Sequence, residues 1–197
     1  MNAQNFDKLM TEEIQRLSEK KRLLLHCCCA PCSSACLERL KEHFEITALF
    51  YNPNIEDAEY IRRKKELLRF IRETGWAEIL ECEHDTKEFY GAVKGSEKEK
   101  EGGKRCEICF KLRLEKTASL AEKGGFDYFC TTLTISPLKN SALINSIGEE
   151  LAKDKRTNWL YSDFKKRNGY LKSIMLGKEY GLYRQNYCGC VYSVKIT

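Results

Sequence analysis

The sequence lacks any apolar run long enough to cross a bilayer, and its first twenty residues are charged where an export signal would be apolar. It also lacks low-complexity tracts and internal repeats, so neither a repeat array nor a fibrous protein is indicated. We therefore expect a protein without a membrane-inserted part, located in the cytoplasm.

A large excess of one charge is missing as well. The chain has 34 basic and 29 acidic residues, a net charge of +5, so local patches matter more than the total. Basic runs lie at 20–22, 62–65 and 165–167. Such runs are able to hold RNA by phosphate contacts, although solvated helix surface explains each of them too.

What the chain has in plenty is cysteine, with eleven in 197 residues. Eight of them form three tight clusters far apart in the sequence: Cys27, Cys28, Cys29 and Cys32, then Cys106 and Cys109, then Cys188 and Cys190. An odd number in close groups does not suit a secreted disulfide scaffold. Adjacent cysteines bond to each other only with strain, but they can share one metal centre. The pattern therefore predicts a metal-dependent redox protein, because thiolates are preferred ligands of zinc and iron–sulfur clusters.

Apolar strand-like runs alternate with amphipathic helical patterns along the chain. The length and the 42% hydrophobic content suit one α/β domain over 1–197, with a mostly parallel sheet and helices on both faces. Residues 1–20 are expected to form a helical extension and 94–105 a charged loop. The expected strands are 21–27, 45–51, 78–82, 126–131 and 159–161, and the expected helices are 33–43, with a serine as N-cap, 57–73, 86–93, 107–123, 140–152 and 170–180.

This architecture predicts where the chemistry takes place. Ligands of open α/β sheets bind beyond the carboxyl ends of the strands, and the first cysteine cluster stands where the first strand ends. The polar segments 52–54 and 131–132 follow two other strands and should open onto the same crevice. The N-terminus of the following helix favours anions, so thiolates there should have a lowered pKa.

Several motifs together resemble the cobalamin-independent epoxyqueuosine reductase family, over roughly residues 22–193. They are His26-Cys27-Cys28-Cys29-Ala30-Pro31-Cys32-Ser33, Phe50-Tyr51-Asn52-Pro53-Asn54-Ile55, Cys106-Glu107-Ile108-Cys109-Phe110 with Arg113-Leu114, Thr131-Thr132-Leu133 with Ser136-Pro137, Asp163-Phe164, and Tyr183-Arg184-Gln185 with Tyr187-Cys188-Gly189-Cys190. The resemblance implies a Rossmann-like fold of the nucleotide-α-hydrolase type. It also implies an oxidoreductase that removes the epoxide oxygen of epoxyqueuosine at the wobble position of transfer RNA, giving queuosine.

The resemblance further implies a [4Fe–4S] cluster and assigns roles to the cysteines. Matching the family motifs makes Cys28, Cys29, Cys106 and Cys109 the cluster ligands, with Cys32 near the cluster or bound to an additional iron. The last two cysteines, Cys188 and Cys190, are expected to form a redox-active pair, with iron ligation as the alternative. The reaction also needs an electron donor, which the sequence does not identify.

A proton donor is required too, because the epoxide oxygen must leave as water or hydroxide. The candidates are Tyr51, Asp163 and Tyr187, for which core packing, helix capping or a salt bridge are competing roles. We expect His26 to be a hydrogen-bonded structural residue of the strand. The remaining cysteines, Cys27, Cys36, Cys82 and Cys130, are interpreted as small buried apolar residues.

Parts of the sequence are also typical of three other functions. Cys29-Ala30-Pro31-Cys32 imitates the disulfide site of a thioredoxin-like thiol oxidoreductase, but that reading leaves the middle and last clusters unexplained. Paired cysteines also suit a zinc-thiolate RNA-binding module. A third function, ATP binding as in transfer-RNA thiolation enzymes, lacks a Ser-Gly-Gly loop after the first strand.

Overall fold

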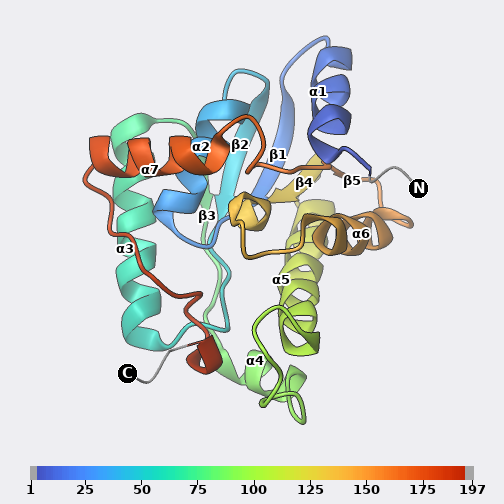
Figure 1. The fold of residues 1–197 in the computed structure, drawn as a ribbon. Coiled ribbons are helices and arrows are strands. Elements are labelled where there is room, and N and C mark those ends of the chain that lie inside the picture. The colour runs from blue at the N-terminus through green and yellow to red at the C-terminus, as the bar shows by residue number, and fades with distance from the viewer. Residues whose placement is uncertain (1–3, 194–197) are drawn as a thin grey trace.

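Five parallel strands form the centre of the computed structural model, which describes residues 4–193 (Figure 1). Their order in the sheet is β3-β2-β1-β4-β5, and every pairing between neighbours is parallel. The bounds are β1 Lys21–His26, β2 Phe44–Leu49, β3 Glu78–Leu80, β4 Tyr128–Thr131 and β5 Asn158–Trp159. The predicted α/β class with a parallel sheet is thus confirmed.

The central strand shows why the sheet is covered on both faces. Leu23, Leu24 and Leu25 of β1 are fully buried, and successive side chains of a strand point to opposite faces. Leu23 and Leu25 join one hydrophobic cluster, whereas Leu24 joins a second one. Two layers of helices are needed to bury such a strand.

The helices supply those two layers. The first cluster receives side chains from α1 (Phe6–Arg16), α2 (Ala30–Leu40), α3 (Asp57–Thr74) and α7 (Gly169–Glu179). The second receives them from α5 (Lys104–Lys123) and α6 (Ser141–Ala152), which Figure 1 shows on the other side of the sheet. Three short elements complete the described chain: α4 (Thr86–Ala92) and the 3-10 helices η1 (Thr132–Ile135) and η2 (Val191–Ser193).

Helix α2 begins earlier than the sequence pattern indicates. The expected start at residue 33 with a serine N-cap is wrong, because the helix begins at Ala30 and Cys29 is its N-cap. The Cys29 sulfur accepts a hydrogen bond from the Cys32 backbone N–H at 3.5 Å. Pro31 fits the first turn because proline lacks a backbone N–H, and an N–H at that position would have no acceptor within the helix. Ser33 lies inside the helix and donates to the Cys29 carbonyl at 2.8 Å.

Other differences are smaller. The charged loop before α5 ends at Gly103, two residues earlier than expected, and its turns are held by Arg105, which donates to the carbonyls of Glu97 and Glu99. Cys82 is only partly buried, so its interpretation as a buried apolar residue was wrong, whereas Cys27, Cys36 and Cys130 are buried. None of the helices within residues 4–193 is long and apolar enough to cross a membrane.

The contact between α6 and β5 gives a test of the second cluster. A Cβ atom at Gly148 would lie 2.2–2.5 Å from ring atoms of Trp159. We expect Gly148→Ala to lower the free energy of unfolding by about 1–3 kcal/mol, as overpacking of a core does. The control Gly177→Ala, at a position of α7 with open space, should raise it by about 0.5–1 kcal/mol. Urea denaturation measures both, and equal stability of the two variants would contradict this account.

Candidate metal and thiol centre

The first cysteine group lies where β1 ends and α2 begins, as predicted. The sulfur atoms of Cys28, Cys29 and Cys32 all lie within 4.8 Å of one another. Cys29 is 1% exposed and the other two are half-buried. Three converging thiols at a helix N-terminus form a donor set that soft metals prefer, so the residues present fit a metal or a metal–sulfur cluster.

The protonation of these thiols is unequal. Hydrogen bonds from Cys29 and Cys32 lower the pKa of Cys28 well below its usual value, and the charge of Lys139 adds to this. The same hydrogen bond to Cys28 raises the pKa of Cys29 to about 12, and the pKa of Cys32 is also raised. Cys28 is therefore the most readily ionised of the three, and a metal ion that binds all three sulfurs must displace protons from the other two.

Polar groups that follow the neighbouring strands β2 and β4 contact the first cysteine group. The Thr132 hydroxyl, just after β4, lies 3.7 Å from the Cys28 sulfur and 3.4 Å from the Cys28 amide. Asn52, after β2, donates from Nδ2 to the Cys27 carbonyl at 2.9 Å. The expectation that segments 52–54 and 131–132 meet the first cysteine cluster is therefore confirmed for Asn52 and Thr132.

The middle and last cysteine groups line one cavity of about 450 Å³, including its open mouth. Cys106 and Cys109 come from the first two turns of α5, whereas Cys188 and Cys190 come from the C-terminal segment. Arg113 and Lys139 line the same cavity. The Cys106 sulfur accepts a hydrogen bond from the Gly102 amide at 3.2 Å, and all eleven cysteines are free thiols.

Arg113 and Lys139 connect this cavity with the first cysteine group. Burial opposes their positive charge, yet thiolates of Cys28 and Cys188 raise the pKa of both side chains. Groups from both cysteine regions are therefore close enough to act on the same two cations. The early and middle clusters face one region of the molecule, not opposite sides.

The C-terminal segment is held by a buried arginine of α3. Arg63 is 1% exposed, and its Nη1 donates to the Cys188 carbonyl at 2.9 Å while Nη2 donates to the Tyr187 carbonyl at 3.4 Å. Its Nε pairs with Glu59 at 2.6 Å. The basic run 62–65 is thus not uniformly solvated surface, since Arg63 fixes the position of the last cysteine group.

His26 has the structural role that was expected. Its Nε2 lies 2.9 Å from the Tyr51 carbonyl and must donate to it, so Nδ1 accepts from the Thr131 hydroxyl at 2.8 Å. Burial, and then the charge of Arg113, lower the pKa of His26 to about 4. The ring is neutral with both nitrogens engaged, and so is not available as a metal ligand.

Two of the three candidate proton donors, Tyr51 and Asp163, differ in their surroundings. The Tyr51 hydroxyl donates to Glu88 of α4, and burial followed by this contact raises the Tyr51 pKa, so the phenol keeps its proton. Asp163 pairs with Lys165 at 2.7 Å and accepts from Ser141 at 3.3 Å. Asp163 therefore already has structural partners. It does not line the cavity that holds Cys106 and Cys188.

A scan against protein-family models matches residues 23–196 to the family described as epoxyqueuosine reductase QueH. Curated relatives of that name include proteins of Streptococcus pyogenes serotype M1 and Staphylococcus epidermidis. The first is 45% identical over 98% of this chain and 79% of the relative, and the second 40% over 96% and 84%. The protein of Thermotoga maritima is 35% identical over 87% of this chain and 90% of its own.

The chain belongs to the epoxyqueuosine reductase family. The resemblance inferred from the motifs is confirmed, and the relatives carry the name of an oxidoreductase. Neither a thioredoxin-like thiol oxidoreductase nor a zinc-thiolate RNA-binding module is supported. Three residues of the site were not predicted from the sequence: Arg63, Glu88 and Lys139. No local pattern pointed to the role of Arg63, because the two carbonyls that it holds lie more than 120 positions away.

Gly189 provides a test of how the last cysteine group is held. Its φ is +103°, and an added Cβ would lie 2.9 Å from Arg63 Nη1 and from a side-chain carbon of Ile55. We expect Gly189→Ala to cost about 1–3 kcal/mol of stability and to speed amide hydrogen exchange around the bonds to Arg63. The control Gly181→Ala also has a positive φ, +57°, but meets nothing within 4 Å.

Hydrogen exchange followed by mass spectrometry separates backbone strain from loss of the arginine contacts. Gly181→Ala should leave exchange at positions 187–190 unchanged. Equal exchange in the two variants at those positions would show that Arg63 does not determine the conformation of the Cys188–Cys190 segment.

Proposed function

We propose that this protein reduces epoxyqueuosine to queuosine in transfer RNA, with a [4Fe–4S] cluster as electron carrier. The conversion of an epoxide to an alkene takes up two electrons and two protons and releases the oxygen as water. The observation that carries the proposal is the grouping of the cysteines in a chain of this family. Cys28, Cys29 and Cys32 lie together, and the middle and last pairs line one cavity.

The donor set supports a division of roles among the cysteines. We assign Cys28, Cys29, Cys106 and Cys109 as cluster ligands, because a cubane needs about four thiolates. Cys32 adjoins Cys28 and Cys29 and is the candidate for an additional iron. A cluster bound there would supply electrons one at a time, and an iron with an open position would act as a Lewis acid toward the epoxide oxygen.

The last pair has a different environment. Cys188 and Cys190 lie on the tethered C-terminal segment, and burial raises the pKa of Cys190. Two neighbouring free thiols are able to give up two electrons and two protons as they form a disulfide, which equals what the epoxide takes up. We therefore propose Cys188 and Cys190 as the redox-active pair, to be reduced again by an external electron donor.

A proton donor beside the crevice is also proposed. Tyr51 retains its phenolic proton next to Glu88 and packs in the same cluster as Cys28 and Cys106. These contacts favour Tyr51. Asp163 stays the second candidate, because its carboxylate already has Lys165 and Ser141 as partners.

Transfer RNA as substrate follows from the family's reaction. A wobble base in an anticodon loop is unpaired already, so it can enter a pocket at little unstacking cost. The turns at 94–103 border the cavity through Glu101 and Gly102. A substrate of this kind also supports a cytoplasmic location.

The experiment is reconstitution with iron and sulfide in the absence of oxygen, followed by incubation with transfer RNA that contains epoxyqueuosine, without cobalamin. With a chemical reductant, nucleoside analysis by mass spectrometry should show conversion to queuosine. A loaded protein that leaves epoxyqueuosine intact under these conditions would reject the proposed reaction.

Cysteine variants test the assignment of ligands. Alanine at Cys28, Cys29, Cys106 or Cys109 should lower bound iron and turnover together, because each removes a ligand. Serine at Cys188 or Cys190 should leave most of the iron but reduce turnover at least tenfold. The matched control is Cys36→Ala, a buried cysteine one helical turn beyond Cys32, which should keep iron and turnover. Equal iron loss in both groups would reject this division of roles.

A further inference from the structure

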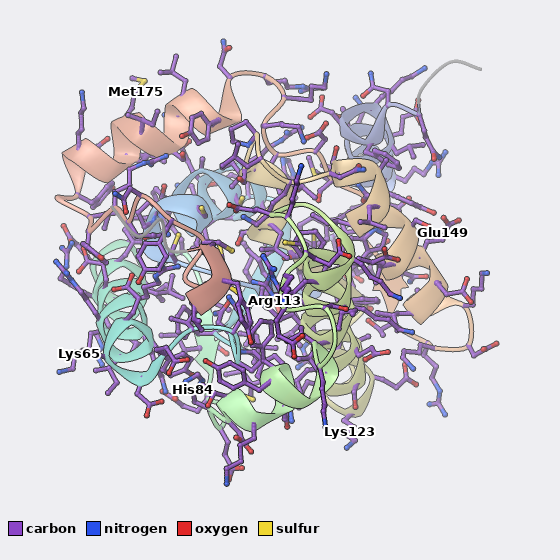
Figure 2. All side chains as sticks on the ribbon, turned by 60° about the horizontal axis from the view of Figure 1, so that its bottom comes forward. Lys65, His84, Arg113, Lys123, Glu149 and Met175 are labelled. Carbon is purple, nitrogen blue, oxygen red and sulfur yellow. The ribbon has the colours of Figure 1, made fainter. Side chains whose placement is uncertain are left out.

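Two cations at the cysteine centre have no acidic partner. Arg113 is 1% exposed, yet within the described part of the chain it forms no ion pair. Its Nε donates to the Cys109 carbonyl at 3.2 Å and its Nη1 to the Asn52 side-chain oxygen at 3.4 Å, while Nη2 is buried without a partner. In Figure 2, Arg113 lies in the middle of the molecule, whereas the labelled Lys65, Lys123 and Glu149 lie toward its outside.

Lys139 approaches the same cavity from the segment between η1 and α6. Over residues 4–193, its ammonium group has neither a hydrogen bond nor a salt bridge. Glu101 is the acidic residue that lines the cavity, and it pairs with neither Lys139 nor Arg113. The two cations therefore face thiols without a carboxylate to neutralise them.

A buried, unpaired charge is costly, so its retention requires another source of negative charge. The cysteine sulfurs that line the same cavity as Arg113 and Lys139 would supply it when they lose their protons to bind a metal centre. Burial works against the charge of Arg113, yet Cys109, Cys188 and Cys28 together raise its pKa. For Lys139 the thiolates of Cys188, Cys28 and Cys32 likewise outweigh burial and raise the pKa. Both side chains keep their charge because they stand beside sulfur.

We propose that Arg113 and Lys139 are the fixed counter-charges of the metal–thiolate centre and make its reduction potential less negative. The inference rests on the proposed function, since it assumes that the cysteines hold a redox metal centre. Reduction adds one negative charge to a centre that thiolates already make negative. Cations that line the same cavity as the cysteines stabilise the reduced form more than the oxidised form. They act as positioning charges, not as ligands or proton donors.

The test is a redox titration of the reconstituted full-length chain, followed by visible absorbance of the bound centre. We expect Lys139→Met and Arg113→Met each to shift the midpoint potential to more negative values. Lys139→Arg and Arg113→Lys retain the charge and should restore most of the wild-type potential. The matched control is Lys111→Met, on the same helix as Arg113, where the side chain is 62% exposed and pairs with Glu115. Its potential should equal that of the wild type.

Because the test uses a variant of each cation, misfolding of one variant does not decide the outcome. Arg113 is fully buried, so Arg113→Met is at risk of losing structure, but the side chain of Lys139 has no bonds to lose. An unshifted potential for Lys139→Met, with the centre bound, would overturn the inference whatever Arg113→Met does. A purely structural role would lower bound iron without moving the potential of the centre that remains.

The same measurements separate this inference from the proposed function. A wild-type chain that binds the centre and converts epoxyqueuosine, with unshifted variants, rejects only the role of the two cations. A wild-type chain that binds no iron under reconstitution rejects the proposed centre and the counter-charges together.

Discussion

The change in strand order between β1 and β4 is the constraint on which the rest of the site depends. From β1 the chain proceeds outward through β2 and β3, and then returns to the other side of β1 with β4 and β5. Parallel strands on both sides of this point send their connections to opposite faces, which leaves a crevice at the carboxyl ends. The vicinal cysteines follow β1 and Thr132 follows β4, so sheet topology alone brings them together.

Topology does not place the other cysteines, and side-chain contacts do so instead. Helix α5 carries Cys106 and Cys109, and residues 181–193 include no strand that would fix the last pair. Arg63 takes over this task through the carbonyls of Tyr187 and Cys188. Hydrogen bonds from a buried cation to carbonyls are among the stronger ones, and an arginine that lost them would be left buried and unsatisfied. The site therefore combines a rigid part on the sheet with a tethered part.

The sequence predicted the parallel sheet, the alternation of strands and helices, and the three cysteine clusters, because hydrophobic periodicity and residue spacing are local signals. It failed where the deciding contact was not local or not usual. Ser33 fits the common N-cap pattern better than Cys29, but Pro31 and a capping sulfur start α2 earlier. Arg63 stands in a basic run typical of solvated surface, and only the folded chain shows its buried carbonyl partners.

Charge links the protonation of the thiols to the cations around them. The pKa of Cys28 is lowered, but the pKa of Cys29 and that of Cys109 are both raised to about 12. Loading a metal centre must therefore expel protons from thiols that hold them tightly. Under the proposed loading, Arg113 and Lys139 would favour the thiolate form, since each new negative charge would arise near a cation without an acidic partner. The same positive charges would therefore favour both the binding of the proposed centre and its reduction.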